Sequence, residues 1–133
     1  MNPPPITLKL DAPSGDYQPG EELAGQFYGE GSQATSLRAV ELSVLWYTAG
    51  QGDEDFAVHH FERFVDEPAR RLDLRRPQRF ATVLATSPLS YDGRIVKVCW
   101  CVRARLFPQQ GPEAVVEVPF RLGGVSGAGS ESG

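Results

Sequence analysis

The chain has 133 residues, of which 41% are apolar and 23% are charged, values typical of a single soluble globular domain with its own core. Its formal net charge of −4 disfavours nucleic acid as the main partner, because nucleic-acid binding needs a positive surface that neutralises phosphates. No apolar run approaches the ~20 residues that a membrane-spanning helix requires, and the N-terminal residues lack the basic and apolar regions of a secretion signal. We therefore expect a cytoplasmic protein with no membrane span.

Alternation of apolar and polar residues dominates the sequence and predicts β-strands, because successive side chains of a strand point to opposite faces. The pattern is clearest from Arg94 to Phe107, where every even position from Val96 to Leu106 is apolar. Glycine, proline and aspartate, which favour turns, separate the alternating runs. In chain order, the predicted strands cover residues 6–10, 23–27, 40–46, 56–64, 80–84, 94–107 and 116–122.

Three segments depart from this alternation. Residues 66–78 are rich in charged side chains and predict an irregular connection between two sheets. Pro119 interrupts the last strand, and because proline cannot donate to a ladder, this strand is predicted to lie at a sheet edge or to carry a bulge. A free edge is a place where another chain can add. The Gly- and Ser-rich residues 123–133 predict a flexible tail.

Two motifs combine a turn with the start of a strand. Residues 17–27 read YQPGEELAGQF, in which Pro19-Gly20 forms the turn and Gly25 leaves room on the core face for a large neighbour. Residues 88–93 read PLSYDG and reverse the chain into its longest strand. Both motifs are similar to signature stretches of arrestin-type domains. The resemblance implies an all-β fold, a two-sheet antiparallel, immunoglobulin-like sandwich of arrestin type with about seven strands, formed by residues 1–122.

Full arrestins carry two such sandwiches in tandem, whereas this chain has room for one, so the hinge and polar core of the family are not carried over. The resemblance implies a non-catalytic adaptor or scaffold-like module that binds a protein partner or associates with itself. The sequence also lacks a Gly-rich phosphate loop, a G-x-S-x-G elbow and an H-E-x-x-H helix. We therefore expect no catalytic residues and no cofactor.

Six residues are candidates for partner binding. Five arginines lie in or beside the 66–78 connection, and arginine binds carboxylates and phosphates with paired hydrogen bonds. Acidic residues are interleaved with them, so a solvated connection with local charge compensation is the competing interpretation. By parity Trp46 and Trp100 belong to the core, which leaves one neighbouring tyrosine as a surface contact. The candidates are Arg70, Arg71, Arg75, Arg76, Arg79 and Tyr47.

The two cysteines suggest an alternative function. Cys99 and Cys101 are two residues apart, so their thiols share one face of a strand and suit free thiols better than a disulfide. Together with His59 or His60 they could hold zinc, which makes a small metal-binding or thiol-dependent enzyme the alternative. The histidines are adjacent, however, and adjacent strand residues point to opposite faces. Cysteines packed in a sheet, with no metal, are the simpler interpretation.

Overall fold

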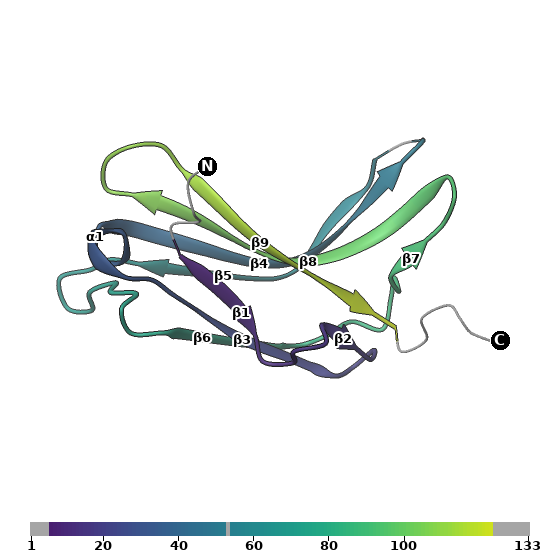
Figure 1. The fold of residues 1–133 in the computed structure, drawn as a ribbon, viewed down its shortest axis with the longest axis horizontal. Helices are drawn as coiled ribbons and strands as arrows, with labels where there is room; N and C mark the ends of the chain where they lie inside the picture. Colours follow the sequence, from purple (N-terminus) through teal and green to yellow (C-terminus); the bar gives the residue numbers. More distant parts are fainter. Residues whose placement is uncertain (1–5, 53, 124–133) are drawn as a thin grey trace.

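The computed structural model describes residues 6–52 and 54–123, which form two β-sheets packed face to face (Figure 1). The small sheet has the strand order β1 (Thr7–Leu10), β3 (Glu22–Tyr28) and β6 (Gln78–Val83). The large sheet has the order β2 (Asp16–Tyr17), β9 (Ala114–Leu122), β8 (Val96–Pro108), β4 (Leu37–Gly50) and β5 (Phe56–Val65), and β7 (Tyr91–Asp92) also pairs with β8. Neighbouring strands are antiparallel, except that β2 and β9 are parallel. A short helix, α1 (Gly31–Thr35), precedes β4.

This architecture confirms the predicted all-β sandwich. Each of the seven predicted strands is present, whereas β2, β7 and α1 are too short to leave a periodic pattern in the sequence. As predicted, residues 66–77 form an irregular crossover, with an isolated bridge between Glu67 and Arg70. No helix in the described ranges is long and apolar enough to cross a membrane. The predicted tail, residues 123–133, lies outside the described residues apart from Gly123.

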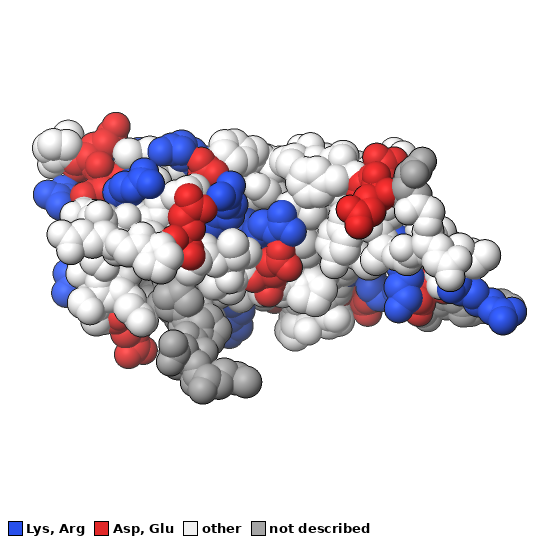
Figure 2. Space-filling model, turned by 90° about the horizontal axis from the view of Figure 1, so that it is seen from above, with Lys and Arg blue, Asp and Glu red and all other residues white. Residues whose placement is uncertain are grey.

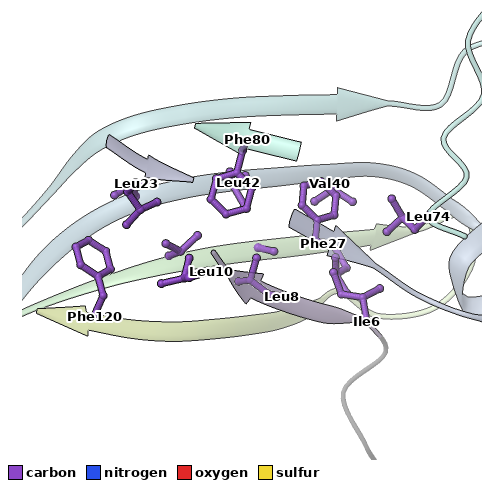
Figure 3. Close-up of a cluster of buried hydrophobic side chains, with 14 of the residues drawn as sticks. Ile6, Leu8, Leu10, Leu23, Phe27, Val40, Leu42, Leu74, Phe80 and Phe120 are labelled. Atoms are coloured by element: carbon purple, nitrogen blue, oxygen red, sulfur yellow. The ribbon is translucent and has the colours of Figure 1, made fainter. Parts of the chain in front are cut away.

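The core lies between the two sheets. β4 and β8 form the centre of the large sheet, and their alternation turns one set of apolar side chains toward β1, β3 and β6. Full burial of each leucine or phenylalanine contributes about 1.5–3 kcal/mol to folding. Figure 3 shows the side chains from both sheets meeting in this layer. Among them are Ile6, Leu8, Leu10, Leu23, Phe27, Val40, Leu42, Leu74, Phe80 and Phe120.

The two tryptophans differ in burial. Trp100 is only 1% exposed, its ring packs against Phe120 and His59, and its Nε1 donates a hydrogen bond to the Pro88 carbonyl oxygen at 2.8 Å. Trp46 lies opposite Trp100 in the β4–β8 ladder but is half-buried and packs at the margin of the core. The reason is that the β4–β5 hairpin bends away from the small sheet (Figure 1). The predicted core position therefore holds fully for Trp100 and partly for Trp46.

Gly25 lies where β3 is held tightly between its two neighbours. It pairs with Leu10 of β1 and with Phe80 of β6. A Cβ atom added at Gly25 would lie 2.5 Å from the Lys9 carbonyl oxygen and 2.8 Å from the Phe80 ring. The glycine therefore makes room for a large core side chain, as its place in the sequence motif predicts.

Replacing Gly25 with alanine is expected to destabilise the fold by about 1–3 kcal/mol, because the added methyl group overlaps backbone in the β1–β3 ladder. The free energy of unfolding, measured by urea denaturation, gives the size of this loss. Ala24→Val, on the outward side of the same strand, is the matched control and should cost less than about 0.5 kcal/mol. A Gly25→Ala protein as stable as the wild type would contradict the close approach.

Pro119 lies on a free edge, as the sequence predicts. The N–H groups of Arg121 and Gly123 donate to carbonyl oxygens of Gly15 and Tyr17, so these residues of β9 turn their N–H groups away from β8. By alternation, the backbone nitrogen of Pro119 also points away from β8. The β8–β9 ladder therefore loses no hydrogen bond through the missing N–H of this proline. β2 pairs only with the last two residues of β9. The preceding part of β9 has no second partner among the described strands.

Candidate functional site

β5 is an edge strand of the large sheet. Nine of its ten residues pair with β4 on one side, and no other described strand pairs with the opposite side. At the end of the ladder, the Asp66 N–H donates to the Arg38 carbonyl oxygen at 2.9 Å. Alternate residues of an antiparallel strand bond to the same partner, so the N–H and C=O groups of Phe61, Arg63 and Val65 point away from β4. β5 therefore presents unpaired backbone donors and acceptors along its free edge.

A β-bulge at His59 interrupts the alternation of β5. The register places His60 opposite Val44 and Val58 opposite Leu45, so His59 is an extra residue with no partner of its own in β4. Side chains before and after an extra residue keep their own alternation, but the two patterns are shifted by one position. The exposed residues of β5 therefore cannot be found by counting every second position along the whole strand.

Both histidines lie on the side of the large sheet that faces the small sheet. The His59 ring packs against Trp100, and its Nε2 lies 2.7 Å from the Val83 carbonyl oxygen of β6. The His60 Nε2 lies 3.4 Å from the Glu62 Oε2 of the same strand. The prediction that the two histidines point to opposite faces is therefore wrong, because the bulge shifts the alternation between them.

The two thiols lie on the other face of the sheet. Cys99 and Cys101 pair with Tyr47 and Leu45 on the outer face, and Trp100 between them points into the core. Both cysteines are free. The sheet thus separates the thiols from the imidazoles, so these side chains do not converge on one zinc ion. Within the part of the chain that the structure describes, no three His, Cys, Asp or Glu side chains form a metal-binding group.

The Cys101 thiol is expected to stay protonated and unreactive at neutral pH. Burial raises its pKa to about 11, and the nearby Glu117 carboxylate adds to the rise. Because the thiolate is the reactive form, Cys101 should be labelled slowly at neutral pH and faster as the pH approaches 11, whereas the half-buried Cys99 should be labelled readily. Rates of thiol labelling in the single-thiol variants Cys99→Ser and Cys101→Ser test this. Equal rates at neutral pH would contradict it.

An apolar row follows the outer side of β5. It consists of Phe56, Val58, Phe61 and Val65, and each of these residues is more than two fifths exposed. Tyr47 pairs with Phe56 at one end of this β5 row and is half-buried, and burial raises the pKa of its hydroxyl group. Natural edge strands are usually short, charged or covered, because an exposed apolar edge pairs with other chains. An uncovered row of this kind indicates an interaction surface.

The outer face of the large sheet divides into a charged part and an uncharged part. Figure 2 looks onto this face and shows acidic and basic side chains intermingled from the left to the centre, then a stretch of uncharged surface, and further charged side chains toward the right end. Ion pairs between residues in or next to neighbouring strands account for the mixture of signs. These pairs are Glu41–Arg63, Arg103–Glu117 and Arg105–Glu113. Because positive charges alternate with negative ones, this face does not offer the positive surface that a nucleic-acid backbone requires.

A groove of about 310 Å³ lies at the C-terminal end of β5, where the crossover of residues 66–77 leaves the large sheet and returns to begin β6. Asp66 holds the crossover in place, since its carboxylate accepts hydrogen bonds from the Leu72 N–H and from the Arg71 guanidinium, and these bonds lower its pKa. The groove, termed here the arginine groove, is lined by Arg63, Val65, Glu67, Arg70, Arg71 and Gln78, among others.

Two of the predicted binding residues lie together in this groove. Arg70 and Arg71 line it together with Arg63 of β5, which no pattern in the sequence indicates. Arg71 pairs with Asp66, whereas Arg70 makes no ion pair with another described residue. The sequence does not indicate Arg63, because this residue lies outside the arginine cluster. It reaches the groove only through the pairing of β5 with β4.

The other predicted arginines lie outside the groove lining. Arg75 pairs with Asp73 within the crossover, and Arg79 pairs with Asp11 across the small sheet. Arg76 forms no ion pair within the described residues. Local charge compensation therefore accounts for part of the cluster, and a partner-binding role for these residues and for Tyr47 stays a prediction.

The Asp73–Arg75 pair should be visible in the titration of Asp73. Hydrogen bonds from the Arg75 side chain and backbone lower the Asp73 pKa from 3.8 to about 2. A depressed folded-state pKa means that the pair stabilises the fold above pH 3.8 and that this contribution is lost as the pH falls through about 2. Arg75→Gln should raise the Asp73 pKa measured by NMR toward 3.8, and Arg76→Gln should change it little. An unchanged pKa in Arg75→Gln would contradict the pairing.

Comparison with known proteins identifies a shared fold. No family model matches the chain, and a search of curated proteins finds no match. Among solved structures, the sporulation control protein Spo0M from Bacillus subtilis is similar, with a TM-score of 0.61 and 17% identity over 89% of this chain. Spo0M has an arrestin-like fold, which supports the predicted resemblance at the level of the fold alone. The match covers 48% of Spo0M, so this chain spans about half the length of that protein.

Proposed function

We propose that this chain is a non-catalytic protein-binding module and that an extended segment of another protein adds to its large sheet along β5. The free edge of β5 supports the proposal, because the outward backbone groups of Phe61, Arg63 and Val65 lie beside the exposed β5 row. In strand addition, main-chain hydrogen bonds provide affinity and side-chain contacts select the sequence. The fold shared with a sporulation control protein is compatible with a regulatory role, and two free thiols fit a reducing, cytoplasmic compartment.

The other sheet edges suit strand addition less well. β1 has four residues and β6 has six, whereas β5 has ten. β9 is covered by β2 at its end and contains Pro119, which has no N–H to offer to a new strand. The bulge at His59 protects part of β5, since bulges disturb edge pairing. The regular stretch from His60 to Val65 remains available.

The arrangement of charges along β5 favours a different protein over a second copy of this chain. Two antiparallel β5 strands related by a two-fold axis would place Glu62 opposite Glu62 or Arg63 opposite Arg63 if the axis passed through either residue. Like charges directly opposite each other destabilise a strand pair. An axis through His60 or Phe61 would bring the His59 bulges of both strands into the pairing. An axis through Phe64 or Val65 would carry the pairing past the end of β5 into the irregular crossover. A segment with a different sequence avoids these conflicts.

A matched pair of proline variants tests the β5 edge. Phe61→Pro removes an outward N–H and adds a ring at the edge, without removing a bond to β4. Val115→Pro is the control, because Val115 of β9 is equally exposed and, by alternation with Arg121, also turns its N–H away from its neighbour β8. Immobilised wild-type and Val115→Pro proteins should capture the same proteins from an extract of the source cell. Phe61→Pro should capture them at least about tenfold more weakly.

The outcomes of this experiment separate the alternatives. Urea denaturation first establishes that both variants are folded. Equal capture by Phe61→Pro and the wild type would contradict binding at β5, and the absence of any captured protein with the wild type would contradict a protein-binding function. A wild-type dimer that becomes monomeric in Phe61→Pro would show that the occupant is a second copy of the chain and would overturn the proposal of a different protein.

A further inference from the structure

We propose that the segment bound by β5 is acidic at the end that lies against the crossover, and that its Asp or Glu side chains bind in the arginine groove. The inference rests on the proposed strand addition and names the chemistry of the partner. It follows from three features of the described residues, which are the continuity of the edge with the groove, the unused donors of the groove arginines, and the pattern of charge around them.

The β5 edge and the arginine groove are continuous. Arg63 and Val65 have outward backbone groups on the edge, and both residues also line the groove. Residues of an added strand that lie opposite them therefore lie at the mouth of the groove. The crossover turns back on itself just beyond, where Glu67 and Arg70 exchange backbone hydrogen bonds of 3.2 and 3.0 Å. An added strand consequently ends, or turns, beside Arg70.

The arginines of the groove retain hydrogen-bond donors for a ligand. Arg70 is exposed and forms no ion pair with a described residue. Arg71 uses Nε and Nη2 to bind Asp66, and Arg63 uses Nη1 to bind Glu41. Because a guanidinium group carries five N–H donors, both residues keep donors that these contacts do not use. A carboxylate beside Arg70 can therefore form a charge-assisted, paired hydrogen bond.

The charges around the groove favour a few carboxylates over a polyanion. The lining contains three arginines and one glutamate, and Glu41 and Asp66 pair with two of the arginines, so the positive charge open to a ligand is centred on Arg70. The adjoining outer face alternates in sign through its ion pairs, and the chain's negative charge repels a long phosphate backbone. One or two acidic residues at the end of an extended segment match this small positive site without meeting the surrounding carboxylates.

Selection from a peptide library tests the inference. A displayed library of random ten-residue peptides, equal in length to β5, is selected on the wild type and on Arg70→Gln, Arg76→Gln and Phe61→Pro. Arg76→Gln is the matched control, because it removes the same charge from the same crossover at a position outside the groove lining. Wild-type and Arg76→Gln proteins should enrich peptides with alternating apolar residues and Asp or Glu at one end. Arg70→Gln should enrich alternating peptides without the acidic preference.

Affinities of the enriched peptides provide the quantitative result. An acidic peptide and its Gln-substituted version should differ about five- to tenfold in binding to the wild type, and the difference should shrink in Arg70→Gln and at high salt. Two outcomes would exclude the acidic partner and leave strand addition in place. In the first, Phe61→Pro enriches no peptide, and the peptides enriched by the wild type show no acidic preference. In the second, Arg70→Gln retains the acidic preference of the wild type. If the wild type enriches no peptide that depends on Phe61, the proposed function fails and the inference fails with it.

Discussion

The ladder between β4 and β8 is the constraint on which the rest of the structure depends. It runs from Leu37 opposite Pro108 to Gly50 opposite Val96 and forms the middle of the large sheet. Because a strand alternates its side chains, this one pairing decides which residues face the small sheet and which face outward. It also leaves one free side on each strand, which β5 and β9 occupy. The position of β5 at the sheet edge, and hence the proposed binding surface, follows from this central pairing.

One extra residue in β5 shapes both faces of the candidate site. The bulge at His59 brings this imidazole against Trp100 and the Val83 carbonyl oxygen, on the side facing the core. On the outer side it lets Phe56, Val58, Phe61 and Val65 form one row despite their uneven spacing in the sequence. The same bulge separates the imidazoles from the thiols. A local irregularity therefore aligns the exposed apolar row and keeps the imidazoles and the thiols from meeting at one zinc ion.

Seven of the 13 lysine and arginine side chains form an ion pair with a carboxylate of the described residues, so the position of an unpaired arginine is informative. Arg71, Arg75 and Arg79 each pair with an aspartate, and the outer face carries further pairs between strands. Exposed pairs of this kind contribute little stability, because water screens their attraction. Arg70 is one of six basic side chains without an ion pair among the described residues, and of these six it alone lines the arginine groove. The proposed acidic partner therefore depends on Arg70 in the groove and not on the arginine cluster as a whole.

The sequence by itself determined the all-β class, the seven longer strands, the irregular crossover and the tight approach at Gly25, because alternation and turn chemistry are encoded by neighbouring residues. It also indicated Arg70 and Arg71. Only the tertiary structure decided that β5 is the long free edge, that Arg63 joins the groove, and that Arg79 is paired with Asp11, 68 residues away. Strand order, the bulge at His59 and such distant pairs depend on packing between segments far apart in the chain, which no local pattern records.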